Sequence, residues 1–181
     1  PAMNMGLEKA AEVAPDAGVV AIGVGNSHHS GVAGHPVEAM ARRGLIALFV
    51  CNGPAGLAPW GGNRALYGTN PIAFACPVEG REPLVIDLSL SKVARGKVKL
   101  AADRGEPIPE GWAVDAEGQP TTEAAAGMAG WMVPAGDAKG AALAMMVELL
   151  AAGLTGSSFG YEASSFFATE GEPPNVGQFF V

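Results

Sequence analysis

Two adjacent segments organise this sequence: residues 18–25, which read GVVAIGVG, and residues 26–34, which read NSHHSGVAG. The first is a short valine-rich run bounded by glycines, which is typical of a buried β-strand. The second is polar and begins where that strand is expected to end. Gly23 and Gly25 resemble the start of the Gly-x-Gly-x-x-Gly dinucleotide fingerprint, but His28 stands where its third glycine belongs. The motif alone therefore does not predict a Rossmann fold.

The flanking segments predict one compact domain, since 181 residues lie within the usual range for a single core. Apolar runs predict strands at residues 45–51, 71–76 and 84–88, with a glycine-rich loop at 52–69. Helices are expected at residues 3–10, 36–43 and 138–152, and residues 89–96 have the composition to open another. Residues 101–132 are expected to be mostly surface loop with short irregular turns. Residues 176–181 begin a strand with nothing to pair it.

Composition argues against several classes of partner. The chain has 18 acidic and 11 basic residues, so its surface repels phosphate backbones and anionic lipid head groups. We therefore expect no nucleic acid and no membrane surface as partners, and the apolar stretches are too short or too interrupted to span a bilayer. Cys51 and Cys76 lie in apolar runs and form no Cys-x-x-Cys pair. They are expected to be core thiols in a reducing cytoplasm.

The first candidate site is the histidine segment at residues 26–34. Histidine exchanges a proton near neutrality, as a hydroxy-acid oxidation or its reverse requires. A solvated loop with incidental histidines is the alternative. A further alternative is a metal site, which would indicate a hydrolase. Its ligands would be His28, His29 and His35, with Asp87 or Cys51 completing the set. No pair has the spacing of a zinc motif, so no metal is expected.

The second candidate site is the helix entry at residues 134–140, which reads PAGDAKG. Asp137 is expected to cap the helix, because its carboxylate can accept from free amides of the first turn. Those amides, the glycines and the ammonium of Lys139 would suit a pyrophosphate. An ordinary capped helix with an exposed lysine is the alternative, and Gly140 in place of Ser or Thr excludes a P-loop.

An ordered series of short motifs covers nearly the whole chain. The series comprises NSHHSG (26–31), APWGG (58–62), LYGTNPIA (66–73), IDLS (86–89), ARGK (94–97), IPEGWAVD (108–115), GQPTT (118–122) and the helix after Lys139. Each motif alone is weakly specific, but their order resembles the malate/L-lactate dehydrogenase family, which is unrelated to the Rossmann-type lactate dehydrogenases. Its members oxidise or reduce small 2-hydroxy and 2-oxo acids such as malate, lactate and sulfolactate, or reduce cyclic 2-imino acids.

The resemblance implies a fold and a set of site residues. The fold is α/β with a mixed, largely antiparallel sheet flanked by helices, a non-Rossmann NAD(P)-binding domain. His29 falls on the histidine of the family's His-x-Gly signature and is the expected proton acceptor, the cofactor is NAD or NADP, and members are homodimers. The expected cofactor contacts are Ser30, Gly31, Val32, Ala33, Gly53, Thr69, Asp87, Leu88, Ser89 and Lys139.

Two parts of the family pattern have no counterpart here. An upstream Ser-His-Gly segment, with a following arginine that holds the substrate carboxylate, is missing before Asn26, and the chain stops where the family continues into a C-terminal segment. We therefore expect residues 1–181 to be a single nicotinamide-binding core domain, a fragment lacking both segments. Some imino-acid reductases of the family assign the acid role to the upstream histidine. A truncated, non-catalytic nucleotide-binding domain is the competing class of function.

Overall fold

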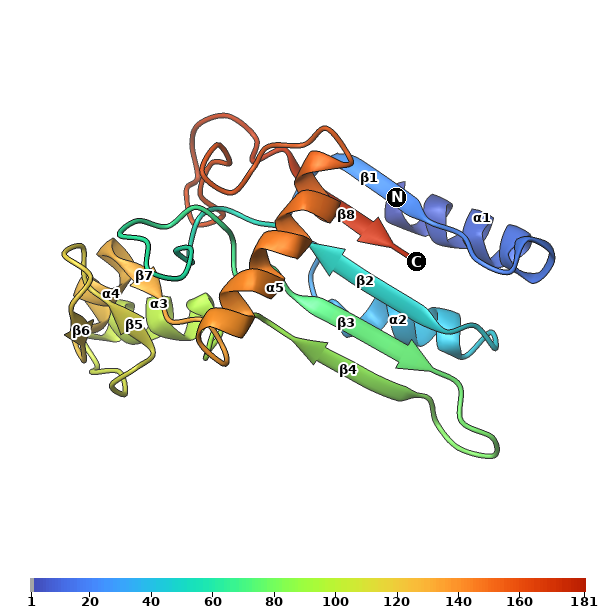
Figure 1. Cartoon of the computed structure of the whole chain (residues 1–181), viewed down its shortest axis with the longest axis horizontal. Coiled ribbons are helices and arrows are strands. Elements are labelled where there is room, and N and C mark those ends of the chain that lie inside the picture. The colour runs from blue at the N-terminus through green and yellow to red at the C-terminus, as the bar shows by residue number, and fades with distance from the viewer. Residues whose placement is uncertain (1) are drawn as a thin grey trace.

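A computed structural model of the chain describes residues 2–181 and is built around a five-stranded sheet (Figure 1). The strand order is β1-β8-β2-β3-β4, and every neighbouring pair is antiparallel. The strands are β1 (Ile22–Ser27), β2 (Ala47–Cys51), β3 (Ile72–Cys76), β4 (Leu84–Leu88) and β8 (Val176–Phe180). The expected non-Rossmann, largely antiparallel sheet is confirmed, and the three apolar runs that follow the histidine segment form strands as predicted.

The position of β8 corrects the prediction that residues 176–181 have nothing to pair them. This strand lies between β1 and β2, with Phe180 opposite both Ile22 and Phe49. Its partners are more than 120 residues away along the chain, so local sequence gives no sign of the pairing. The stacked rings of Phe49 and Phe180, 4.3 Å apart between centroids, fix the register at the centre of the sheet.

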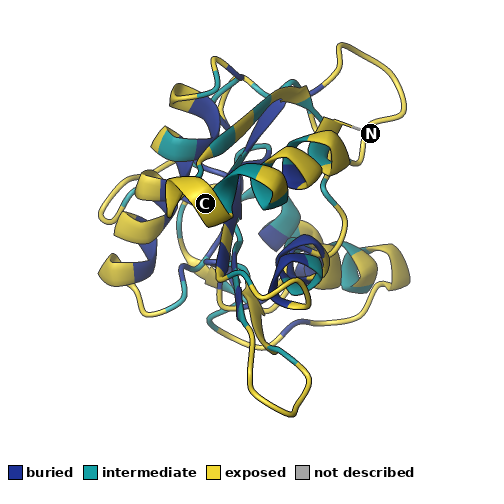
Figure 2. Ribbon diagram, turned by 90° about the vertical axis from the view of Figure 1, so that its right-hand side faces the viewer, coloured by how far each residue is buried: buried dark blue, intermediate teal, exposed yellow. Residues whose placement is uncertain are grey.

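Helices cover the two faces of this sheet unequally. On one face, α1 (Ala2–Ala17) and α2 (Gly34–Ala41) pack on Phe49 and Phe180 through apolar side chains such as Leu7 and Val37. On the other face lies α5 (Ala138–Glu148), which continues as the π-helical segment η1 (Leu149–Gly153) and crosses the strands near one end (Figure 1). Buried residues gather on the strands and on the inward sides of the helices (Figure 2). No helix within residues 2–181 is long and apolar enough to span a membrane.

A small lobe replaces most of the predicted surface loop at residues 101–132. It contains α3 (Arg95–Arg104), α4 (Ala124–Ala129) and a three-stranded sheet in the order β6-β5-β7, from β5 (Ala113–Val114), β6 (Pro120–Thr121) and β7 (Trp131–Met132). The loop prediction was wrong because the strands have only two residues each and leave no periodic pattern. Side chains of the lobe nevertheless belong to the core. Val98 of α3, Ala113 of β5 and Met132 of β7 are fully buried and join the cluster that contains Val50 of the main sheet.

One helix start differs from prediction, and another lies within its predicted segment. Asp137 precedes α5, but it has φ 56° and its carboxylate makes no capping hydrogen bond. The carboxylate instead lies 3.9 Å from the ammonium of Lys92. The helix expected to open within residues 89–96 begins at Arg95, with Ala94 at the N-cap and no side chain capping it. Both helix entries therefore leave backbone amides free of side-chain acceptors.

Candidate active site

The histidine segment leaves the sheet at the end of β1 and is anchored from the neighbouring strand. Asn26 has φ 49°, which turns the backbone out of the extended conformation. The Nε2 of Gln178 on β8 then donates to Ser27 Oγ at 2.9 Å and to the carbonyl of His28 at 3.4 Å. The loop that follows therefore starts from a fixed point on the central strands, and it ends at Gly34, where α2 begins.

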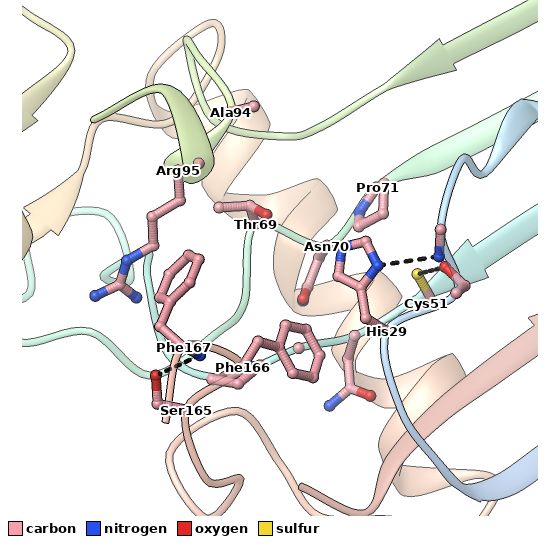
Figure 3. A pocket seen from close by; sticks show the side chains of 16 residues that line it. His29, Cys51, Thr69, Asn70, Pro71, Ala94, Arg95, Ser165, Phe166 and Phe167 are labelled. Carbon is pink, nitrogen blue, oxygen red and sulfur yellow. Dashed lines mark hydrogen bonds between the residues drawn. The ribbon is translucent and has the colours of Figure 1, made fainter. Parts of the chain in front are cut away.

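A cavity of about 220 Å³ opens beside this loop, and we call it the His29 cavity (Figure 3). It is large enough for a small acid or a single ring and too small for a whole dinucleotide. Its lining comes from four other segments besides the loop: the end of β2, the residues before β3, the start of α3, and residues 165–167. Its lining residues are His29, Ser30, Gly31, Cys51, Asn52, Gly53, Pro54, Thr69, Asn70, Pro71, Ala94, Arg95, Gly96, Ser165, Phe166 and Phe167.

His29 is held by a hydrogen bond that sets its tautomer. The backbone N–H of Gly31 donates to His29 Nδ1 at 3.0 Å, so the neutral ring carries its proton on Nε2. In Figure 3 the ring nitrogen without a dashed line faces Thr69 and Asn70. In this tautomer the Nε2–H of His29 can donate to an oxygen of a bound ligand. To accept a proton at Nε2, the ring must first move its own proton to Nδ1 and give up the bond from Gly31.

Aromatic rings form a wall next to the histidines. The ring of Phe166 lies 5.1 Å from that of His28 and 5.3 Å, edge-on, from that of His29. On the opposite side, Ser30 Oγ lies 3.5 Å from Cys51 Sγ, and burial raises the pKa of the Cys51 thiol to about 11. Cys51 is therefore a neutral thiol at physiological pH and an inert part of the cavity.

The charge of the cavity is opposite to that of the chain. The chain has a net charge of −7, yet the lining contains Arg95, His29 and no acidic residue. The guanidinium of Arg95 donates to the carbonyls of Ala55 and Met128. Burial lowers its pKa, and no carboxylate within residues 2–181 forms a salt bridge with it. A half-buried cation without a counter-charge favours an anionic ligand.

The expected site residues fall into two groups in space. The cavity brings together His29, Ser30, Gly31, Gly53 and Thr69. It excludes Val32, Ala33, Asp87, Leu88, Ser89 and Lys139. The two groups are connected, because the carbonyl of Thr69 accepts from Leu90 N at 2.8 Å, directly after the strand that holds Asp87 and Leu88.

Contacts of the second group differ from residue to residue. The carboxylate of Asp87 accepts from Gly34 N at 2.7 Å and so satisfies the first backbone N–H of α2. Ser89 Oγ lies 3.2 Å from Ser91 Oγ, and Leu90 O accepts from Ala135 N, which brings the start of α5 alongside. Lys139 is exposed in the first turn of that helix.

The backbone at Gly31 beside the cavity and at Gly136 before α5 leaves room for a bound cofactor. Gly31 has φ 78° and a side chain built there would meet nothing within 4 Å; the same holds for Gly136, with φ 67°, before α5. Open backbone beside a helix start with a lysine suits a phosphate, so Gly136 and Lys139 fit a nucleotide. Among the described residues, no three His, Cys, Asp or Glu side chains gather as metal ligands.

Several cavity residues escaped the sequence analysis. Asn52 and Asn70 each stand next to a strand, a position where a polar side chain often serves a site, and this signal was available. Phe166 and Phe167 lie in a segment for which nothing was predicted. Glu148, buried behind the cavity, was visible as a lone acid in an apolar helix, which is rarely buried without partners.

Comparison with known proteins identifies the family of the chain. The profile of the malate/L-lactate dehydrogenase family matches residues 1–181. The chain is 65% identical over its whole length to a (2R)-3-sulfolactate dehydrogenase (NADP(+)) from Chromohalobacter salexigens and covers 54% of that protein. It superposes with a TM-score of 0.92 on Δ1-piperideine-2-carboxylate reductase from Pseudomonas syringae, at 41% identity, over 99% of this chain and 55% of the other.

A sulfolactate dehydrogenase from Methanocaldococcus jannaschii superposes with a TM-score of 0.85 at 32% identity, over 98% of this chain and 51% of the other. The chain thus spans about half the length of the relatives it matches. The match of the family profile covers every residue, and the ordered motifs that suggested the resemblance lie within it. This chain belongs to the malate/L-lactate dehydrogenase family.

Proposed function

We propose that the protein carrying this chain is an oxidoreductase that transfers a hydride between NADP or NAD and the C2 atom of a small 2-hydroxy acid. A sulfolactate-type acid is the first candidate because the 65% identical relative is named for that substrate and for NADP. The observation that carries the proposal is the His29 cavity, which combines an imidazole donor with a guanidinium that has no carboxylate partner, and which has no acidic lining. Such a cavity attracts an acid and hydrogen-bonds its 2-oxygen.

The proposed chemistry divides between the cofactor and the chain. A bound NADP or NAD would supply the hydride acceptor or donor for C2 of the acid, and the residues of the chain would supply the proton and the binding groups. His29 would exchange the hydroxyl proton at Nε2: it would accept the proton as the Nδ1–H tautomer in the oxidation and return it as the imidazolium in the reduction, and both forms require release of the bond from Gly31 N to Nδ1. Arg95 supplies positive potential for the anionic end of the substrate, and Phe166 excludes water next to the ring.

The proposed cofactor contacts are those expected from the sequence. Ser30, Gly31, Gly53 and Thr69 lie in the cavity and would meet the nicotinamide end. The second group, with Lys139 at the start of α5, would meet the phosphates; its remaining members are Val32, Ala33, Asp87, Leu88 and Ser89. The contact between Thr69 and Leu90 supports one continuous binding surface.

The proposal is tested by steady-state rates of the intact protein. Reduction of NADP⁺ and NAD⁺ is measured with both enantiomers of 3-sulfolactate, malate and lactate, and we expect the highest kcat/KM for a sulfolactate with NADP⁺. Oxidation of NADPH with Δ1-piperideine-2-carboxylate tests the second candidate, an imino-acid reductase, which the similarity to the Pseudomonas syringae enzyme favours. Nucleotide binding without turnover on any of these compounds would indicate the non-catalytic alternative.

We also propose a homodimer in the cytoplasm. The sheet face that carries α5 leaves an apolar row across four strands, formed by Val181, Leu48, Phe74 and Ile86, of which Leu48, Ile86 and Val181 are exposed. Exposed apolar rows of this kind favour association with another polypeptide surface. Two free thiols, one of them buried, fit a reducing compartment. Sedimentation equilibrium of the intact protein measures the oligomeric state directly.

A further inference from the structure

The carboxylate of Glu148 is buried behind the His29 cavity. Glu148 is the last residue of α5 and is 3% exposed, although the helix around it is apolar. An isolated buried carboxylate is strongly disfavoured, so its partners must provide most of the stabilisation that water would give. The proposed chemistry gives this acid no direct role.

Every hydrogen-bond partner of Glu148 is a donor. Asn52 Nδ2 donates to Oε1 at 3.0 Å, Asn70 Nδ2 donates to Oε2 at 2.7 Å, and Gly160 N donates to Oε1 at 2.6 Å. The backbone N–H of Gly68 donates as well. Four N–H donors suit the ionised carboxylate, since a protonated oxygen would point a hydrogen at one of them.

Each donor belongs to a loop that lines the cavity. Asn52 precedes Gly53, and Gly68 and Asn70 flank Thr69. Gly160 begins the segment that leads to Phe166 and Phe167. None of the four donor residues lies in a helix or strand, so no regular ladder of backbone hydrogen bonds sets their positions.

Both hydrogens of each asparagine amide are engaged, and the oxygen of Asn52 is engaged as well, whereas Asn70 Oδ1 is buried without a partner. Asn52 Nδ2 also donates to Ser158 O at 2.9 Å, and its Oδ1 accepts from Gly177 N of β8 at 2.8 Å. Asn70 Nδ2 also donates to Ala144 O at 2.8 Å. Both hydrogens of each amide are used, so neither side chain can turn without breaking a bond to Glu148.

We propose that Glu148 is the positioning residue of the His29 cavity, whose carboxylate holds the three loops at residues 52–54, 68–71 and 158–167 in their ligand-binding arrangement. Glu148 contacts no cavity space itself and acts through Asn52, Asn70 and Gly160. The idea that the arrangement serves a nucleotide and an acid rests on the proposed function. The arrangement itself does not depend on which ligand binds.

The test compares Glu148→Gln with Glu162→Gln. Glutamine keeps the size of Glu148 but replaces one acceptor oxygen by an NH₂ that faces N–H donors. Glu162 is a matched control, since its carboxylate also accepts a backbone N–H, that of Phe159 at 2.9 Å, in the same segment but at the surface. Amide hydrogen exchange by mass spectrometry and NADPH affinity by fluorescence titration are measured on the intact protein for wild type and both variants.

In Glu148→Gln we expect exchange in the three loops to rise about tenfold or more while α1 and β1 keep wild-type rates, and NADPH to bind about tenfold more weakly to the folded protein. Glu162→Gln should match wild type in both. Exchange that rises uniformly through the core, with unchanged NADPH affinity, would make Glu148 merely structural and overturn the proposal, as would unchanged loops. If wild type binds neither NADPH nor NADH, the proposed function fails while the exchange pattern still decides the role of Glu148.

Discussion

Gly177 of β8 offers the sharpest test of how the sheet and the cavity are coupled. A Cβ added at this residue would lie 1.7 Å from Ala151 O and 2.6 Å from Thr155 Oγ1. Ordinary contact begins near 3.4 Å, so the η1 backbone would have to withdraw by about 1.7 Å. The φ of Gly177 is not positive, so a substitution here acts through packing and not through backbone strain.

The expected cost of Gly177→Ala combines two effects. Overpacking against rigid backbone costs about 1–3 kcal/mol or more, and separation of Gly177 N from Asn52 Oδ1 leaves buried polar groups unpaired at about 1–3 kcal/mol. A loss of about 2–6 kcal/mol is a large share of the roughly 5–15 kcal/mol that stabilises a typical protein. Urea unfolding followed by tryptophan fluorescence measures it.

Gly23→Ala is the matched control for this measurement. Gly23 lies on β1 beside the same turn, where an added Cβ would meet the movable Cγ2 of Thr155 at 3.2 Å. We expect the control to change the free energy of unfolding by less than about 1 kcal/mol. The reasoning is refuted if the free energy of unfolding of Gly177→Ala lies within about 1 kcal/mol of the wild-type value, or if it falls by no more than that of the control. In either case β8 and η1 are not packed backbone against backbone.

Four further outcomes are expected. His29→Ala should lower kcat about 10²–10⁴-fold with a smaller effect on NADPH affinity; a loss confined to affinity would make it a cofactor ligand. Lys139→Ala should weaken NADPH binding about ten- to hundredfold, and NADH binding less if the lysine meets a 2′-phosphate; equal affinity of both proteins for both nucleotides would remove it from the site. Cys51, with its pKa near 11, should react with iodoacetamide at pH 8 only after unfolding, whereas the half-buried Cys76 reacts sooner, as peptide mapping would show. Burial raises the pKa of Glu148 above its usual range, although four hydrogen bonds lower it. The stability that Glu148 contributes is therefore full at acidic pH and is lost as pH rises through the raised pKa. The free energy of unfolding of wild type, relative to that of Glu148→Gln, should fall over that pH window, and a difference that does not change with pH would contradict the raised pKa.

Sequence periodicity located the elements that carry their own signal. Strands β2, β3 and β4 are apolar runs bounded by turn residues, and the helix at 138–152 consists of helix formers, so α5 and η1 lie where expected. The insertion of β8 between β1 and β2 was not predictable, because it joins segments about 150 residues apart. The small lobe was missed because its two-residue strands are defined by tertiary contacts such as those of Ala113 and Met132.

The candidate site was predictable to a similar depth. The histidine segment follows a strand, and Thr69 and Gly53 lie in glycine-rich loops, so the motifs indicated several residues that line the His29 cavity. They did not indicate what holds those groups in place. That role falls to residues with a single weak signal each, such as an acid within an apolar helix or an asparagine beside a strand. The alignment of the two asparagine amides on Glu148 depends on the folded positions of loops that lie 96 and 78 residues from it along the chain.

The names of the relatives bear on how far the region covered by this chain can determine substrate specificity. A sulfolactate dehydrogenase and a piperideine-2-carboxylate reductase both align with essentially the whole chain, although one name denotes a C–O and the other a C=N substrate. The two reactions have in common hydride exchange, a proton at the reacting heteroatom and an anionic substrate. Under the proposed function, His29 and Arg95 would supply the proton and the positive charge. Discrimination between oxygen and nitrogen must then depend on a few substitutions around the His29 cavity or on the half of the relatives that this chain does not cover. Exchange of cavity residues between the two enzymes, followed by the ratio of kcat/KM for the two substrates, separates these origins.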